Sequence, residues 1–408
     1  MKRSPLAPAN TPALPEISGV RLAVAESNIR YKNRPDLLLA AFDEGTTVAG
    51  VLTQSKVVAA PVIWCRKMLP QGKARCLVVN AGNANAFTGE GGLVSVAHVG
   101  ASAAFALECK KEEVLMASTG VIGEPLPDSK ISALLPDMAA KLSPKGWDAA
   151  ARSIMTTDTF AKAATRKARI GQTEVTINGI AKGSGMIAPN MATLLAFVFT
   201  DAAIPAPVLQ ALLSDANEKS FNSITVDGDT STNDTLLAFA TGAAKHDPVK
   251  SAGDKHLAEF KAAFTDLLTE LAVLIVRDGE GAQKLVTLDV LGAESDTAAR
   301  NIALTIANSP LVKTAIAGED ANWGRIVAAA GRAGEQLVQE KIEVTIGGTL
   351  VAKDGARVQG FDEAPVAAHM KGQDIRITLD LHLGKGVARV YTCDLTHGYI
   401  DINGSYRS

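Results

Sequence analysis

The chain has 408 residues and a formal net charge of −2, with 41 Lys and Arg against 43 Asp and Glu. Hydrophobic residues make up 47% and charged residues 21%, which excludes a mainly disordered chain. The balanced charge and an aromatic content of only 4% argue against a nucleic-acid-binding protein, which needs a basic surface and often stacking side chains.

The cysteines and the apolar runs predict a soluble protein of the cytoplasm. The four cysteines show no CxxC spacing, and a chain of this length needs no disulfides. The basic start is interrupted by prolines before an apolar stretch forms, so it does not have the pattern of a secretory signal. The apolar run 192–199 is far shorter than the ~18–20 residues of a membrane span.

The first half of the chain predicts alternating strands and helices after a Pro-rich start. Asp128 is expected to cap a helix, because Ile131, Leu134 and Met138 follow at helical spacing on one face. Another helical pattern covers 93–109. Strands are predicted from short β-like runs and from polar–apolar alternation at 76–80, 114–118, 173–180 and 192–199.

The second half contains the clearest helix, 255–276, in which apolar residues recur every three or four positions. Pro205 and Pro207 are expected to open a shorter helix before it. After a further helix near 295–307, two β-hairpins are predicted, 341–346 with 349–352 and 375–382 with 387–393. The interspersed elements predict an α/β or α+β fold of two regions, 1–283 and 284–408.

Common catalytic and binding motifs are missing from the sequence. The six histidines are scattered, and no HExxH, P-loop or GxSxG pattern occurs. Gly183 to Ala188 fits G-x-G-x-x-A, but a dinucleotide site needs this turn to open a helix, and here Pro189 and an apolar β-like run follow. A nicotinamide oxidoreductase built on this motif is therefore disfavoured.

The crowded segment Lys182-Gly-Ser-Gly-Met-Ile-Ala-Pro-Asn-Met-Ala-Thr193 is more informative. A threonine hydroxyl needs a nearby base before it can act as a nucleophile. If the chain breaks before Thr193, the new α-amine of the threonine can be that base, and a constrained Gly/Pro-rich bend is a backbone that can promote such a break. Composition and spacing alone favour the simpler interpretation, in which Thr193 begins a buried strand after an ordinary turn.

Several motifs in order resemble the glutamate N-acetyltransferase (ornithine acetyltransferase) family of arginine biosynthesis, from about Gly19 to Ser408. Besides the segment before Thr193, they are Asn80-Ala-Gly-Asn-Ala-Asn85, Ser118-Thr-Gly-Val-Ile-Gly123, Thr156-Thr-Asp-Thr159, Thr225-Val-Asp-Gly-Asp-Thr-Ser-Thr-Asn-Asp-Thr235, Asp278-Gly-Glu-Gly-Ala282, Asp320-Ala-Asn-Trp-Gly-Arg325 and Cys393-Asp-Leu-Thr396 with Ile402-Asn403.

The resemblance implies a layered fold of the N-terminal-nucleophile type, with a smaller C-terminal α/β domain that contributes its tail to the active site. It implies self-cleavage between Ala192 and Thr193, with Thr193 as the nucleophile that carries the acetyl group. Thr119 and Gly120 match the oxyanion hole of the family. The positions that match its substrate contacts are Thr156, Lys182, Thr193, Glu280, Asn403 and Ser408.

These roles agree with the chemistry of the residue types. Lys182 and Glu280 suit an amino-acid substrate, although without the resemblance both would be interpreted as solvated surface charges. The run Asp227 to Thr235 is rich in turn formers and is not named as a site. The tail departs from many relatives, which end in Asp-Tyr-Arg-Thr or similar, but Ser408 keeps a hydroxyl.

The resemblance predicts a double-displacement acetyltransferase that moves an acetyl group from N-acetyl-ornithine to glutamate without a metal, nucleotide or flavin. It leaves open whether acetyl-CoA is a second donor, and it suggests an α2β2 assembly of the two cleaved chains. The alternatives are a self-processing amidohydrolase or aminopeptidase, the nicotinamide oxidoreductase, and a relative that folds but never cleaves.

Overall fold

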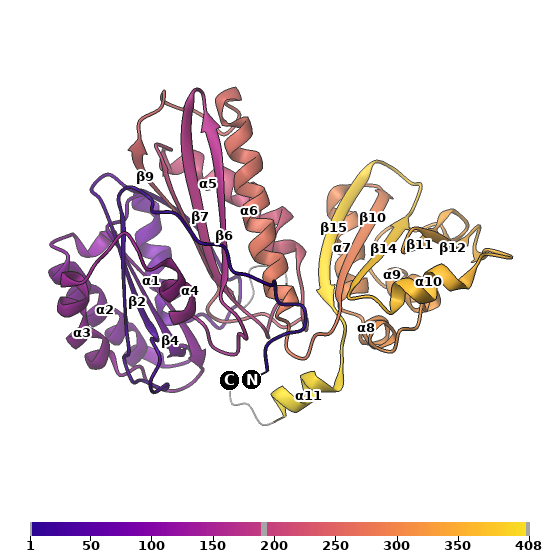
Figure 1. Ribbon diagram of the computed structural model, residues 1–408, viewed down its shortest axis with the longest axis horizontal. Coiled ribbons are helices and arrows are strands. Elements are labelled where there is room, and N and C mark those ends of the chain that lie inside the picture. The colour runs from indigo at the N-terminus through magenta and orange to yellow at the C-terminus, as the bar shows by residue number, and fades with distance from the viewer. Residues whose placement is uncertain (1, 189–193, 405–408) are drawn as a thin grey trace.

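The computed structural model describes residues 2–188 and 194–404 and shows the predicted α/β architecture of layered sheets and helices (Figure 1). Within these residues three sheets occur, two in the larger part of the molecule and one in the smaller. None of the described helices is both long and apolar enough to cross a membrane.

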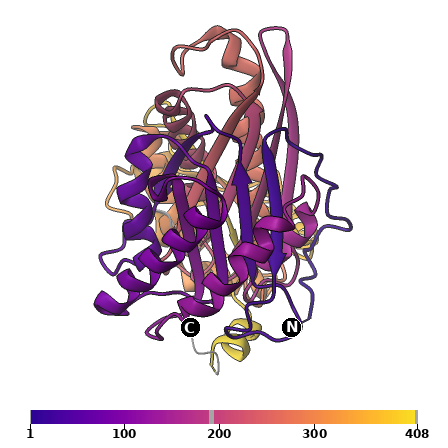
Figure 2. The same cartoon turned by 90° about the vertical axis from the view of Figure 1, so that its left-hand side faces the viewer.

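The first sheet lies between helices and the second sheet. Its strands, in the order β1-β2-β4-β5, are β1 (Val20–Ala25), β2 (Leu37–Phe42), β4 (Cys76–Asn83) and β5 (Val114–Val121). One face is covered by α2 (Gly89–Ala106) and α3 (Asp128–Ala140), the helices nearest the viewer in Figure 2. Two shorter helices, α1 (Ala60–Met68) and α4 (Trp147–Ser153), complete this part.

The second sheet packs face to face on the first through a buried apolar layer. Phe42 of the first sheet stacks on Phe239 of the second with ring centroids 4.3 Å apart. The strand order is β3-β9-β8-β7-β6. Its members are β3 (Thr47–Leu52), β6 (Lys162–Ile170), β7 (Thr173–Lys182), β8 (Leu195–Ala202) and β9 (Thr235–Ala244).

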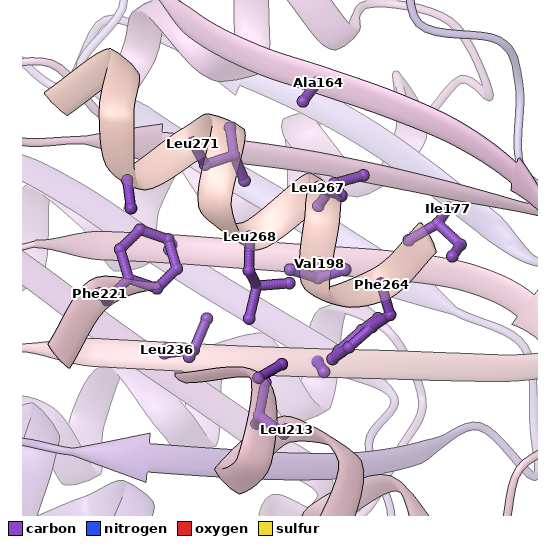
Figure 3. Close-up of a cluster of buried hydrophobic side chains, with 14 of the residues drawn as sticks. Ala164, Ile177, Val198, Leu213, Phe221, Leu236, Phe264, Leu267, Leu268 and Leu271 are labelled. Carbon is purple, nitrogen blue, oxygen red and sulfur yellow. The ribbon is translucent and has the colours of Figure 1, made fainter. Parts of the chain in front are cut away.

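The outer face of the second sheet is covered by α5 (Ala206–Lys219) and α6 (Ala258–Arg277). Figure 3 shows Phe264, Leu267 and Leu271 of α6 pointing onto the strands of the sheet. Each leucine buried in this way stabilises the fold by roughly 1.5–3 kcal/mol. The apolar residues whose helical spacing was predicted over 255–276 therefore form the face of α6 that covers the sheet. The larger part of the molecule has four layers, in the order helix–sheet–sheet–helix.

The smaller part is a six-stranded sheet, ordered β13-β12-β11-β14-β10-β15, whose apolar core draws its buried side chains from residues 286–390. The strands are β10 (Leu285–Ala293), β11 (Glu343–Ile346), β12 (Thr349–Lys353), β13 (Ala356–Arg357), β14 (Asp374–Asp380) and β15 (Gly386–Cys393). The helices are α7 (Asp296–Ala307), α8 (Pro310–Ala317), α9 (Trp323–Ala330), α10 (Glu363–Met370) and the terminal α11 (His397–Asn403).

Single turns of 3₁₀ helix connect several of these elements. They are Leu69–Gln71, Lys111–Glu113, Phe221–Ser223, Lys255–Leu257 and Gln339–Lys341.

The prediction of two hairpins in the C-terminal region is confirmed for one and wrong for the other. Strands β11 and β12 pair antiparallel across Gly347-Gly348. Strands β14 and β15 do not pair with each other, because β10 lies between them, parallel to β14 and antiparallel to β15. The chain leaves the sheet near Gly384 between these two strands, but β10, about 90 residues earlier in the sequence, lies between them.

The expected role of Asp128 as a helix cap is also wrong. The residue is the first of α3, Pro127 occupies the cap position, and no side chain caps this end. A carboxylate oxygen of Asp128 instead lies 3.1 Å from Nδ1 of His98 on the neighbouring helix α2. The negative charge of Asp128 still lies in the first turn of α3, where it interacts favourably with the helix dipole.

Candidate active site

A cavity of about 270 Å³ lies where strands of the two packed sheets end and the terminal helix α11 returns to the larger part. Its walls come from segments that are far apart in the sequence. The lining residues are Ala84, Thr119, Gly120, Ile122, Thr156, Thr157, Lys182, Gly185, Met186, Asp227, Asp229, Ser231, Thr232, Asn233, Glu280, Tyr399 and Asn403.

The predicted oxyanion-hole pair lies near the end of β5, on one wall of the cavity. Thr119 is buried, and its hydroxyl oxygen accepts a hydrogen bond from the Lys182 ammonium at 3.2 Å. Because the oxygen is already an acceptor, the hydroxyl proton is free to be donated to a bound molecule. Gly120 follows directly, so a hydroxyl and a main-chain segment of this strand face the same space.

Gly120 occupies a position that only glycine can fill. Its φ is +134°, and a Cβ there would lie 2.2 Å from the carbonyl carbon of Gly82 and 2.5 Å from the nitrogen of Asn83. Adding a methyl group must push β5 away from β4, since both obstacles are backbone. The wall of the cavity therefore depends on this close approach of two strands.

We expect Gly120→Ala to lower the free energy of unfolding by about 1–3 kcal/mol and to disrupt the cavity wall. Thermal unfolding followed by circular dichroism measures the first effect. Gly123→Ala is the matched control, because Gly123 also has a positive φ, +83°, but has no atom within 4 Å of the added Cβ. Equal melting temperatures for Gly120→Ala and the wild type would contradict the close approach.

Lys182 is the buried cation of the site. It is the last residue of β7 and is 3% exposed, whereas composition alone suggested a surface charge. Burial lowers the pKa of Lys182, and the nearby carboxylates of Asp158, Asp234 and Glu280 oppose that shift. A cation held in this way is suited to an anionic group of a ligand, which would replace part of the lost hydration.

Glu280 and Asn403 meet across the cavity. The amide of Asn403, from α11, donates a hydrogen bond of 2.7 Å to a carboxylate oxygen of Glu280. Glu280 approaches the chain at Gly185 so closely that a Cβ there would lie 2.4 Å from the same carboxylate. Thr156 lines the cavity as well. The C-terminal helix thus contributes directly to the cavity wall.

The run Asp227 to Thr235 also borders the cavity, although the sequence analysis did not name it as a site. Asp227 accepts hydrogen bonds from the backbone N–H groups of Met186 and Ile187 at 2.6 and 2.9 Å. The Tyr399 hydroxyl donates to the same carboxylate at 3.2 Å, and desolvation together with this negative charge raises the pKa of Tyr399. Residues of this run that the sequence analysis interpreted as turn formers therefore line the cavity.

Asp234, at the end of the same run, is fully buried and lies beside Leu194. One carboxylate oxygen accepts the Leu194 N–H at 2.7 Å, and the other has no hydrogen-bond partner among the described residues. Burial raises the pKa of Asp234 well above its ordinary value. Sequence reasoning missed this residue, whose only signal was its place in the motif that ends at Thr235.

The predicted site residues are therefore largely brought together. Thr119, Gly120, Thr156, Lys182, Glu280 and Asn403 all line one cavity. Ala192, Thr193 and Ser408 lie outside the described residues, and Leu194 is the nearest described neighbour of Thr193.

The motif Gly183 to Ala188 opens no helix in the described part of the chain. Its Met186 and Ile187 N–H groups are bonded to Asp227 rather than left for a pyrophosphate. Among residues 2–188 and 194–404, no group of three or more His, Cys, Asp or Glu side chains is arranged to hold a metal ion.

The layered α/β fold holds a cavity that combines a buried lysine, a carboxylate and hydroxyl groups, a combination suited to a small charged molecule. The family of the protein follows from comparison with known proteins. The sequence pattern of the ArgJ family matches residues 21–408.

Two relatives are named arginine biosynthesis bifunctional protein ArgJ. The protein of Gluconobacter oxydans is 58% identical over 397 residues, covering 97% of this chain and 94% of the relative. That of Bradyrhizobium diazoefficiens is 56% identical over 408 residues, covering 99% of each chain. A crystal structure of the protein of the same name from Bacillus halodurans is 41% identical and covers 50% of this chain and 96% of that chain, with a TM-score of 0.49. The chain belongs to the ArgJ family.

Proposed function

We propose that the cavity transfers the acetyl group of N2-acetyl-ornithine to glutamate through an acetyl ester on Thr193. As a member of the ArgJ family, the chain is an acetyltransferase of arginine biosynthesis. The observation that carries the proposed site is the convergence of residues from distant segments on one cavity. These residues are Thr119, Gly120, Thr156, Lys182, Glu280 and Asn403.

The first half of the reaction breaks the acetamide bond. The α-amine of Thr193, freed by self-cleavage after Ala192, takes the proton of the Thr193 hydroxyl, and the oxygen attacks the acetyl carbonyl. Thr119 donates its hydroxyl proton, and Gly120 its N–H, to the oxygen that becomes negative. The ammonium of Thr193 then returns the proton to the departing nitrogen, and ornithine leaves.

The second half repeats these steps in reverse with glutamate. The neutral amine of glutamate attacks the acetyl ester, loses a proton to the Thr193 amine, and displaces the Thr193 oxygen, which regains that proton. Lys182 suits the α-carboxylate shared by both amino acids, because a buried charge needs a partner of opposite sign. Glu280 suits their α-nitrogen, because its carboxylate can accept hydrogen bonds from the N–H groups of the amide and of the amine. Ser408 is assigned to the same amino-acid subsite by the resemblance alone.

A kinetic experiment separates this function from the amidohydrolase alternative. The protein is incubated with N-acetyl-ornithine, with and without glutamate, and free ornithine and acetyl-glutamate are quantified. We expect one burst of ornithine without glutamate and continuous release with it, because the acetyl ester then has an acceptor. Fast release without glutamate that glutamate does not change would establish a hydrolase instead.

The relatives are named bifunctional, which supports a second activity in this chain. We assign to it acetyl-CoA as an alternative acetyl donor, so that glutamate is acetylated without ornithine. Release of CoA that depends on glutamate tests this assignment. Glutamate acetylation seen only with N-acetyl-ornithine would restrict the chain to the exchange reaction.

The assembly and organisation complete the proposal. Residues 1–283, which include the cleavage point, form the catalytic region, and residues 284–408 form a C-terminal domain that supplies Asn403 and the tail. The two cleaved chains assemble as α2β2 in the cytoplasm. Light scattering of the purified enzyme tests the assembly, with twice the mass of one 42.4 kDa chain as the expected result.

Asp234 gives a prediction for processing, because it holds the Leu194 N–H one residue after the proposed nucleophile. We expect Asp234→Ala to slow self-cleavage by about tenfold, since a buried N–H left without its acceptor costs about 1–3 kcal/mol. The ratio of precursor to cleaved chains on a denaturing gel measures the rate. Asp234→Asn is the control, because an amide oxygen still accepts, and equal rates for all three proteins would contradict the role.

A further inference from the structure

A buried cluster of three charges lies beside the cavity without lining it. Lys162, at the start of β6, places its ammonium 2.6 Å from a carboxylate oxygen of Asp158 and 2.6 Å from one of Asp278. The side chains of all three are 0% exposed. None of them borders the cavity, so none is in a position to contact a bound substrate.

Asp158 holds the backbone on both sides of the cluster. One of its oxygens accepts the N–H of Thr156 at 3.0 Å, and the other accepts the N–H of Gly183, the residue after Lys182, at 2.7 Å. Attraction by Lys162 and Lys182 outweighs desolvation and holds the pKa of Asp158 below its usual range. The carboxylate is therefore an ionised anchor between two segments that each carry a proposed substrate contact.

Asp278 connects the third segment, which carries Glu280, through hydrogen bonds of its carboxylate and its backbone. Its carboxylate accepts the Thr159 N–H at 2.8 Å, and its backbone carbonyl accepts the Ser184 hydroxyl at 2.6 Å. Two residues on, the N–H of Glu280 donates to the carbonyl of Ser184 at 3.1 Å. The loop of Glu280 is thus joined both to the segment after Asp158 and to the segment after Lys182.

Stability alone is a weak reason for such a cluster. Removing charges from water is costly, and replacing a buried ion pair by apolar residues of similar volume is often neutral or stabilising. The cluster occurs at the point where three segments with proposed substrate contacts meet. Its position, rather than its net contribution to folding, indicates its role.

We propose that Asp158, Lys162 and Asp278 form a positioning triad that sets the spacing of Thr156, Lys182 and Glu280 for the amino-acid part of the substrate. The inference rests on the proposed function of the cavity and deepens it. The triad acts through its neighbours, since it does not touch the substrate.

The test compares Lys162→Met, Asp158→Asn and the double variant Lys162→Met/Asp278→Asn with the wild type. Dissociation constants for ornithine and glutamate are measured by calorimetry, KM and kcat by the transfer assay, and melting temperatures by circular dichroism. The size of the ornithine burst gives the concentration of active sites, and kcat is calculated per active site. A partly unfolded preparation then has a lower rate per total protein but an unchanged KM. Lys284→Met is the control for burial, because Lys284 is a buried lysine bonded to the carbonyls of Met370 and Gly372, outside the cavity wall.

We expect Lys162→Met and Asp158→Asn to raise KM and the dissociation constants of both amino acids by about tenfold, with kcat per active site changing by less than roughly threefold. The double variant removes one charge of each sign and is expected to recover melting temperature but not affinity. Lys284→Met is expected to lose melting temperature at unchanged KM. This combination is not expected of a merely structural cluster.

The triad is overturned if both Lys162→Met and Asp158→Asn bind within twofold of the wild type, if the double variant restores affinity together with stability, or if Lys284→Met raises KM equally. If Lys162→Met does not fold, Asp158→Asn, which has nearly the same shape, decides by the same criteria. A wild type that binds ornithine but transfers no acetyl group would overturn the proposed function and leave the triad testable by binding.

Discussion

Thr193→Ala is expected to leave one continuous chain of 42.4 kDa that transfers no acetyl group. The substitution removes the oxygen that would both attack the preceding carbonyl and carry the acetyl ester. It also keeps the α-amine inside a peptide bond, where it is no base. Both the maturation and the reaction are therefore lost together, while the fold is retained.

Mass measurement under denaturing conditions decides this prediction. The wild type should give two fragments of roughly 20 and 22 kDa, by proportional chain length. N-terminal sequencing should find a second start at Thr-Leu-Leu-Ala. Thr193→Ser is the control, since it keeps a hydroxyl and should still cleave. Acetyl transfer by Thr193→Ala, or by an unbroken wild-type chain, would overturn the mechanism.

Thr119→Ala is expected to lower kcat by about 10²–10³, because one preorganised donor to a developing oxyanion is worth about 2.7–4 kcal/mol of the barrier. The hydroxyl contributes little to packing, so the melting temperature should change little by comparison. Lys182 loses its 3.2 Å acceptor in this variant, which adds to the effect on binding.

Transfer kinetics and melting temperature, measured together, test this assignment. Thr119→Ser keeps the donor and is expected to retain most of the activity. The ornithine burst should keep its size but become slower in Thr119→Ala, since Thr193 is still intact. Loss of soluble protein, or a melting temperature that falls as steeply as the activity, would make Thr119 a structural residue.

Local patterns predicted the elements whose signal lies within a short stretch of chain. The apolar spacing of 255–276 is the face of α6, and the β-like runs at 76–80 and 114–118 are the first residues of β4 and β5. The second hairpin failed for a different reason. No residue between β14 and β15 indicates that β10, far away in the sequence, pairs with both.

The site shows the same limit. From composition alone, Lys182 and Glu280 were expected to be surface charges, and only the resemblance indicated that they contact the substrate. Composition could not predict their burial, because the segments that bury them are distant in the sequence. Lys162 had no signal at all: its two carboxylate partners lie 4 and 116 residues away. The run Asp227 to Thr235 forms bends and irregular backbone that leads into β9, and several of its residues line the cavity.

The strand order of the second sheet affects how the cleaved enzyme can refold. Strands β3, β6 and β7 precede position 192, whereas β8 and β9 follow it and lie between them. Once the proposed bond opens, neither polypeptide contains all the strands of the second sheet, so we expect the break to follow folding. After denaturation of the cleaved enzyme, the two separate polypeptides would have to associate again to rebuild this sheet. We therefore expect the yield of refolded enzyme to depend on protein concentration for the cleaved form but not for the unbroken precursor.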